Sequence, residues 1–151
     1  MGMTLSFTRV TPEELDRAFE DPDLAEEFVE DESRPYCFLE KSWAGIGFLM
    51  RAAGVDVDLY EDGDPIDEEA TRWGWSAPMV ARTAKALSAV PVEVLVSHYD
   101  PAKLSAEGVY PMRNMWDADD LEYLRENYVD LVEFFQETAA VGGAAIRDFS
   151  F

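Results

Sequence analysis

Apolar and polar residues alternate at the start of the chain, where Met3, Leu5 and Phe7 are each followed by threonine or serine. Successive side chains of an extended strand point to opposite faces, so this period of two predicts a strand with one apolar face. The final segment, residues 144–151, is also rich in residues that favour strands. A terminal strand needs a partner, and we therefore expect the two terminal strands to pair.

Two short helices are predicted directly after the first strand. Thr11 is the expected N-cap of the first helix, Pro12 takes its first helical position, and Glu14 completes a capping box. Asp21-Pro22 repeats the start signal, and the second helix is expected to end before residues 33–35, where a proline breaks the pattern.

A third helix is expected from Leu39 to Ala53, because apolar residues recur there at helical spacing and Gly54 is a typical stop. Gly45 and Gly47 lie inside this helix, where each glycine costs about 0.5–1 kcal/mol relative to alanine. We expect the close approach of another backbone segment to compensate for this cost.

The remainder of the chain is predicted to be mostly helical. Residues 55–69 are expected to form a loop with one short strand, and helices are predicted at 76–90, 91–99 and 101–108. The longest helix is expected to begin at Asp117 or Asp119 and to end at Gly142-Gly143. The sequence thus predicts an α+β fold, one compact domain over residues 1–151, mostly helical, with a small antiparallel sheet that pairs the terminal strands.

Acidic residues dominate the charge. The chain has 32 acidic and 12 basic residues and a formal net charge of −20, although 48% of its residues are hydrophobic. Such a surface repels nucleic-acid phosphates and anionic lipid headgroups, so we expect neither nucleic acid nor a membrane as a partner. The expected partner is a basic protein surface. Most of the acids lie in three regions, residues 13–32, 56–69 and 117–137.

Cysteine usage and the absence of a targeting segment favour a cytoplasmic location. Cys37 is the single cysteine and lies in an apolar run, where a lone thiol packs as a small hydrophobe. No basic and then apolar leader is present, and no apolar stretch approaches the ~20 residues of a membrane span. The pattern leaves the oligomeric state open.

Four stretches together resemble one family of small bacterial proteins. They are the Gly2-Met3 start with its strand, the segment 39–49, the Val109-Tyr110-Pro111 motif followed by Trp116, and the long last helix closed by Gly142-Gly143 and a final strand. In their order and spacing they resemble the YfbM-like family, whose function is unknown. The resemblance covers the whole chain and implies an α+β single-domain fold, but it implies no activity.

The chain departs from this family pattern at two places. Relatives often carry histidine or a larger residue where this chain has Ala44 and Gly47, and a Gly-Tyr-Gly-Pro-like turn where it has residues 73–78. Any polar chemistry that relatives have on the segment 39–53 is therefore not expected in this chain. A role that depends on Lys41 and Trp43 could persist, because both residues are present.

The tryptophans are the strongest candidates for a ligand site, because an indole buries a large apolar area and keeps one N–H donor. Trp73 and Trp75 flank Gly74 at a predicted helix entry. The candidate ligand-binding residues are Lys41, Trp43, Trp73, Trp75, Tyr110 and Trp116. The competing interpretation is that the tryptophans pack in the core and that Lys41 forms a structural ion pair.

No catalytic residue, metal site or cofactor is predicted. His98 is the single histidine and is of a residue type that often acts as a general base, but no second histidine, nucleophile elbow or available cysteine accompanies it. Residues 58–69 partly match a calcium loop, with Gly63 and Glu69 at the expected positions but Tyr60 where an oxygen ligand is needed. Near-matches arise by chance in a chain this acidic, so a solvated acidic loop is the preferred interpretation.

Three functional hypotheses follow from these observations. The leading one is a non-catalytic intracellular binding module for a basic protein partner, in an inhibitor or immunity-type role, because the charge speeds association with a cationic surface. The rival is an enzyme or small-molecule binder with a tryptophan-lined pocket, which requires Lys41, Tyr110 or His98 to converge with the tryptophans. The third holds that the acidity is only an adaptation of the host for solubility or salt.

Overall fold

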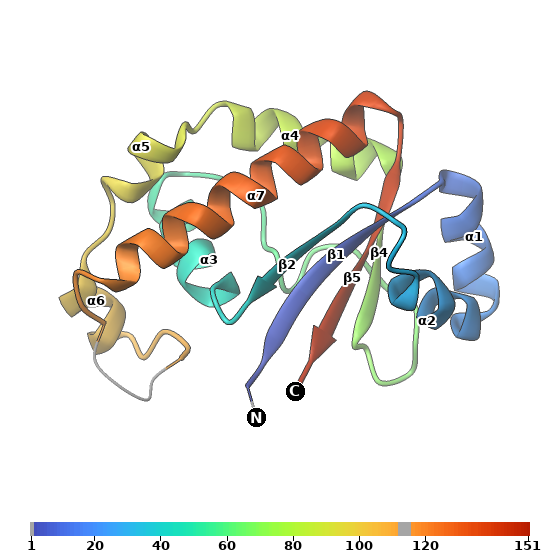
Figure 1. The fold of residues 1–151 in the computed structure, drawn as a ribbon, viewed down its shortest axis with the longest axis horizontal. Coiled ribbons are helices and arrows are strands. Elements are labelled where there is room, and N and C mark those ends of the chain that lie inside the picture. Colours follow the sequence, from blue (N-terminus) through green and yellow to red (C-terminus); the bar gives the residue numbers. More distant parts are fainter. Residues whose placement is uncertain (1, 112–115) are drawn as a thin grey trace.

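A five-stranded antiparallel sheet of order β2-β1-β5-β4-β3 lies at the centre of the fold, which a computed structural model describes for residues 2–111 and 116–151. The strands are β1 Thr4–Val10, β2 Tyr36–Glu40, β3 Asp64–Pro65, β4 Arg72–Trp75 and β5 Ala144–Ser150. The first and last strands pair in the middle of the sheet, from Thr4 opposite Ser150 to Val10 opposite Ala144. The two ends of the chain therefore lie side by side (Figure 1), and the predicted pairing of the terminal strands is confirmed.

The sheet is larger than the terminal pair that the sequence predicts. Residues 36–40 form β2 beside β1, and residues 72–75 form β4 beside β5 rather than a helix entry. The helix expected from Leu39 begins instead at Trp43, after Glu40 has taken a positive φ of 53°. Both strands are short apolar runs, and periodicity alone cannot separate such a run from a buried turn of helix.

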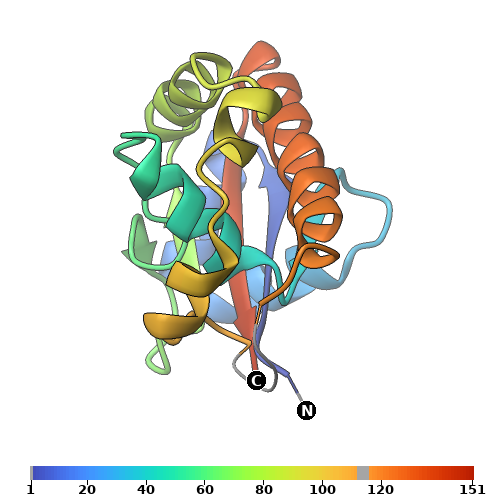
Figure 2. The same cartoon turned by 90° about the vertical axis from the view of Figure 1, so that its left-hand side faces the viewer.

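Seven helices of the described chain cover the two faces of this sheet. They are α1 Pro12–Glu20, α2 Pro22–Glu30, α3 Trp43–Ala52, α4 Ala77–Ser88, α5 Val92–Val96, α6 Pro101–Ala106 and α7 Asp120–Ala140. Helices α1 and α2 lie at one end of the sheet, and α3, α5 and α6 lie at the other, while α7 runs obliquely across it (Figure 1). Figure 2 shows α4 on the left and the long helix α7 on the right of the central strands, and residues of both helices belong to one hydrophobic core. Among the described residues, no helix is both long and apolar enough to cross a membrane.

Two hydrophobic cores form on the two faces of the central strands. In the larger core, the Phe7 ring meets the rings of Trp75 and Phe135 edge to face, with centroids 4.9 and 5.1 Å apart. The smaller core packs α1 and α2 against β1 and β5, with Phe28 and Ile146 among its members. The predicted apolar face of α7 is buried as expected, including Leu124, Tyr128, Leu131 and Phe135.

The two glycines of α3 have different surroundings. A Cβ atom on Gly45 would lie 2.8 Å from Leu124 Cδ2 and 2.8 Å from Trp116 Cη2, so side chains approach here, not the backbone that the sequence led us to expect. A Cβ atom on Gly47 would meet only Arg51 Nη1, at 3.6 Å. Close packing thus explains Gly45 but leaves Gly47 unexplained by the core.

Replacing each of these glycines by alanine should therefore change stability in opposite directions. Gly47→Ala should raise the free energy of unfolding by about 0.5–1 kcal/mol, because alanine has the higher helix propensity and the space is open. Gly45→Ala should lower it, because overpacking costs about 1–3 kcal/mol and outweighs the same gain in propensity. Urea denaturation of both variants measures the difference, and equal shifts would contradict the packing at Gly45.

Candidate functional site

Trp43, the first residue of α3, lies at the centre of an aromatic cluster. Its ring stacks on those of Tyr60 and Tyr110, at centroid distances of 5.6 and 5.8 Å, and meets Phe149 edge to face at 5.5 Å. The indole N–H donates to the Met3 carbonyl at 3.0 Å, and the Met3 N–H donates to the Tyr110 hydroxyl at 2.7 Å. Two of the predicted site residues therefore meet, and they hold the start of β1.

Lys41 lies beside the same cluster. A Cβ atom on Gly2 would clash with Lys41 Cε and lie 3.0 Å from the Tyr110 hydroxyl oxygen, so the lysine stem packs along the first residues of the chain. Its backbone N–H donates to the Tyr123 hydroxyl at 3.2 Å. The ion pairs of the described residues do not include Lys41.

Arg147 of β5 connects this cluster to Trp73. Its guanidinium carbon lies 5.2 Å from the Tyr60 ring centroid and 5.1 Å from the Trp73 ring centroid, and it donates to the carbonyls of Tyr60 and Thr71. The side chain is only 1% exposed, and this burial lowers the pKa of Arg147 to about 10, so it stays charged at neutral pH. Neither Arg147 nor Tyr60 is among the candidate site residues predicted from the sequence. The available signal was a lone arginine on the apolar face of the last strand, between Ala145 and Phe149.

Trp75 and Trp116 lie apart from this cluster. Trp75 packs against Phe7 and Phe135 in the larger core, where its indole nitrogen has no hydrogen-bond partner. The Trp116 ring packs on Gly45, and its indole N–H donates to the Val109 carbonyl at 3.1 Å. The structure thus joins Trp43, Tyr110 and Lys41, reaches Trp73 only through Arg147, and places the other two candidate tryptophans among buried residues.

A hollow of about 330 Å³ opens beside Trp43 on the outer side of α3. Its wall is Trp43 and Tyr60, and its charged lining includes Arg51 together with three acids. The acids are Asp58, Glu61 and Glu107. The two small residues Ala44 and Gly47 also line this hollow. Their lack of side-chain volume leaves the space open.

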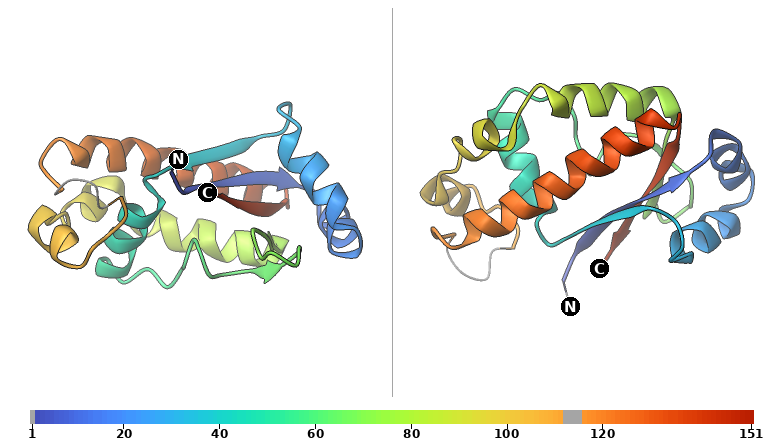
Figure 3. Two further views of the ribbon diagram at one scale, coloured as in Figure 1. Left: turned by 90° about the horizontal axis from the view of Figure 1, so that it is seen from below. Right: turned by 45° about the horizontal axis from the view of Figure 1, so that its top comes forward.

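A second concave surface surrounds β2, which forms one margin of the sheet (Figure 3, left panel). Cys37 and Leu39 point into the larger core, whereas Tyr36 and Phe38 are 63% and 50% exposed. Both of these exposed rings line two hollows, of about 640 and 500 Å³. The acids of the larger hollow are Asp130, Glu133 and Glu137 of α7, and those of the smaller are Asp31 and Glu32.

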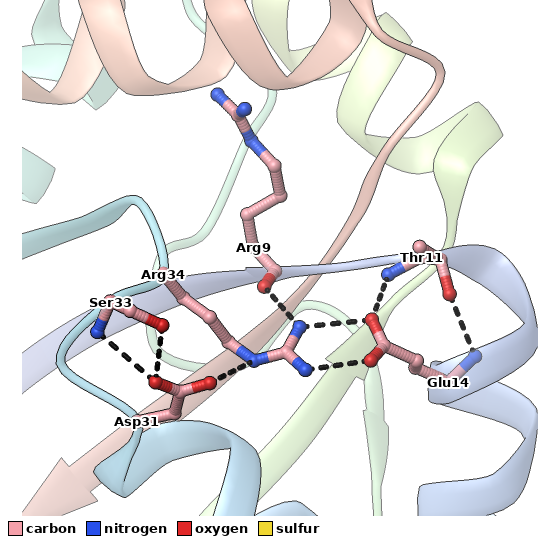
Figure 4. A network of polar contacts seen from close by, with 6 residues as sticks. All are labelled: Arg9, Thr11, Glu14, Asp31, Ser33 and Arg34. Atoms are coloured by element: carbon pink, nitrogen blue, oxygen red, sulfur yellow. Dashed lines mark hydrogen bonds and ion pairs between the residues drawn. The ribbon is translucent and has the colours of Figure 1, made fainter.

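Arg34 fixes the turn that leads into β2 (Figure 4). Its guanidinium donates to both carboxylate oxygens of Glu14, at 2.9 and 2.6 Å, and Arg34 Nε lies 3.3 Å from the Asp31 carboxylate. Asp31 also accepts a hydrogen bond from the Ser33 N–H at 3.1 Å. The hydrogen bonds from Arg34 lower the pKa of Glu14 to about 2. Arg34 is the one cation among the described residues that line the larger hollow, and it is therefore already paired.

The acids of the partial calcium loop and the thiol of Cys37 contribute to local structure. The Asp58 carboxylate accepts from the N–H groups of Tyr60 and Glu61, and the Asp62 carboxylate accepts from the Asp58 N–H, so these acids cap their own turn. The described residues contain no group of three or more histidine, cysteine or acidic side chains that could hold a metal ion. Burial raises the pKa of Cys37 to about 12, which keeps its thiol protonated at neutral pH.

Comparison with known proteins establishes the family. A family model described as a domain of unknown function, DUF1877, matches residues 1–147. The chain belongs to this family. Its fold is similar to that of the protein of unknown function YfbM from Escherichia coli, with a TM-score of 0.71, 13% sequence identity, and coverage of 97% of this chain and 99% of that one. The resemblance to the YfbM-like family is thus confirmed, and no curated protein matches the chain.

The Arg34 network predicts a specific pH dependence. Glu14 has a folded pKa of about 2 against an ordinary value of 4.5, so the unfolded chain takes up its proton first as the pH falls. The contribution of Glu14 to stability should be complete above about pH 4.5 and should be lost as the pH falls towards 2. Glu14→Gln should remove this part of the pH dependence of the unfolding free energy.

Glu13→Gln is the matched control, because Glu13 is exposed in the same first turn of α1 and belongs to none of the described ion pairs. Urea denaturation between pH 2 and 7 compares the two variants with the unmodified protein. Identical pH profiles for the Glu13 and Glu14 variants would contradict the role assigned to Arg34.

Proposed function

We propose that this protein is a non-catalytic binding module for a basic protein partner, in an inhibitor or immunity-type role. One observation carries the proposal. Asp130, Glu133 and Glu137 line a concave surface, and Arg34, the one basic residue in the described part of its lining, is already paired with Glu14 and Asp31. Acids gathered in a hollow whose described cation is already paired favour a partner that brings positive charge.

The charge of the whole chain supports the same proposal. A formal net charge of −20 creates a long-range field that attracts cationic proteins and raises their association rate. The ion pairs of the described residues involve only five acids, which are Glu14, Asp31, Glu93, Glu122 and Asp148. Most carboxylates therefore remain available to an external charge.

A salt titration of binding kinetics tests this proposal. Proteins captured from the native host at two salt concentrations would be identified by mass spectrometry, and the purified partner would then be measured by surface plasmon resonance. Exposed charges are screened over about 8 Å at physiological ionic strength, so the association rate should fall steeply with salt while the dissociation rate changes much less.

Replacing the acids of the hollow should slow association at low salt by about tenfold. The variant is Asp130→Asn, Glu133→Gln, Glu137→Gln. The control is Asp56→Asn, Glu68→Gln, Glu69→Gln, which removes the same charge from exposed positions, two of them in the β3–β4 connection at the opposite edge of the sheet. Each exposed substitution should shift stability by less than about 0.5 kcal/mol.

Equal rates for the two triple variants would place the contact elsewhere on the surface. A recovered partner that is itself acidic, or an association rate that does not respond to salt, would overturn the proposal. The acidity would then be an adaptation of the host.

The hollow beside Trp43 supports a second candidate function, the binding of a small molecule. Its volume of about 330 Å³ lies at the lower end of the range typical of ligand sites, and it combines aromatic walls with charged groups. A small molecule that co-purifies with the protein should be lost in Gly47→Leu, which fills the hollow. It should be retained in Ala52→Leu, an exposed position on the same helix outside the lining. Native mass spectrometry reports both, and equal retention would contradict this second function.

A further inference from the structure

The outer edge of β2 is free for backbone pairing. This strand pairs with β1 on one side, and no other strand of the described chain lies on its other side (Figure 3, left panel). The Pro35 carbonyl accepts from the Arg9 N–H, and Cys37 stands opposite Phe7. Hydrogen bonding alternates along an antiparallel ladder, so the N–H and C=O groups of Tyr36 and Phe38 point away from β1.

This edge strand keeps an unprotected stretch, because its ladder with β1 is regular at residues 36–38 and the register shifts only beyond them, towards Glu40. Edge strands are commonly blunted by lysine, by proline within the strand or by a covering segment, because unpaired backbone groups are a template for another chain. The strand Tyr36–Glu40 contains neither lysine nor proline, and two large rings, those of Tyr36 and Phe38, are exposed on it. Apolar side chains beside free backbone groups are the features of a strand-addition site.

The acids lie on both sides of this edge. One hollow lies between β2 and α7, with Asp130, Glu133 and Glu137 in its lining, and the other lies on the opposite face, with Asp31 and Glu32. Successive side chains of an added strand point to opposite faces, so they would enter the two hollows in turn. Lysine and arginine suit these positions, because their alkyl stems pack along aromatic rings while their charged groups reach carboxylates.

We infer that the free edge of β2 binds an extended basic segment of the partner protein as an additional strand of the sheet. This inference rests on the proposed function and names the site and the form of the partner. The negative charge of the protein favours a basic segment over a second copy of the chain as the occupant of this edge. Pairing two β2 edges would bring the same acids of two molecules of charge −20 together.

Hydrogen exchange with a defined probe tests the inference. The probe is a seven-residue peptide that repeats Lys-Lys-Val-Val, so that lysine side chains face both hollows, and the control peptide repeats Glu-Glu-Val-Val. In NMR exchange measurements on the intact protein, saturating Lys–Val peptide should slow exchange of the Tyr36 and Phe38 amides by at least tenfold. The Cys37 amide should change little, because it already faces β1.

Two substitutions at one position separate the backbone from the side chain. Phe38→Ala and Phe38→Pro both remove the ring, but only proline also removes the outward N–H. Proline is tolerated on an edge strand where the N–H faces solvent. Phe38→Pro should therefore weaken binding of the Lys–Val peptide at least tenfold more than Phe38→Ala, with slow exchange at Cys37 as evidence that β2 still pairs with β1.

The outcomes distinguish the inference from the proposed function. If the Lys–Val peptide binds, and the Asp130, Glu133 and Glu137 substitutions weaken it, but the Tyr36 and Phe38 amides exchange as fast as before, strand addition is wrong and the acidic binding function stands. Equal binding of the Glu–Val peptide would overturn both. Concentration-dependent protection of Tyr36 and Phe38 without peptide, together with a dimer in sedimentation, would identify a second copy as the occupant and overturn the inference.

Discussion

The pairing of the first strand with the last is the interaction on which the rest of this structure depends. Strands β1 and β5 occupy the middle of the sheet, and each hydrophobic core uses one of their faces. Pairing residues 4–10 with residues 144–150 closes almost the whole chain into a loop, which costs conformational entropy. Burial of apolar side chains in the two cores must offset this cost. Helix α7 enters β5 directly through Gly142, at a φ of +67°, so the course of α7 across the sheet follows from the same pairing.

A buried cation ties the aromatic cluster to this central pair. Desolvating a guanidinium is unfavourable, and Arg147 is held by two ring faces and two carbonyls rather than by a contacting carboxylate. These contacts connect β5 to the loop at Tyr60 and to β4 at Trp73. The polar atoms of Trp43 and Tyr110 bind the backbone of Met3. The cluster that the sequence suggests as a ligand site is thus in large part the structural support of the two chain ends.

The acidity and the open edge of β2 have linked physical consequences. Arg34 pairs with Glu14 and Asp31 and so holds the turn before β2, which leaves the acids of α7 beside the edge without that cation. Like charges on two copies oppose pairing of their edges, so the charge protects a strand that carries two exposed rings. The same field favours an approaching basic surface.

Local pattern determined much of the fold from the sequence alone. Alternation identified β1, the capping box and Asp21-Pro22 located α1 and α2, and the apolar face of α7 was placed correctly, because each signal depends on neighbouring residues. The net charge is likewise a property of the sequence. Short runs such as Tyr36–Glu40 carry no distinguishing period, and only pairing with β1 made that run a strand. The stacking of Trp43 with Tyr60 and Tyr110, the crowding of Gly45, and the gathering of α7 acids around a free edge were decided by tertiary structure, because each joins residues far apart in the chain.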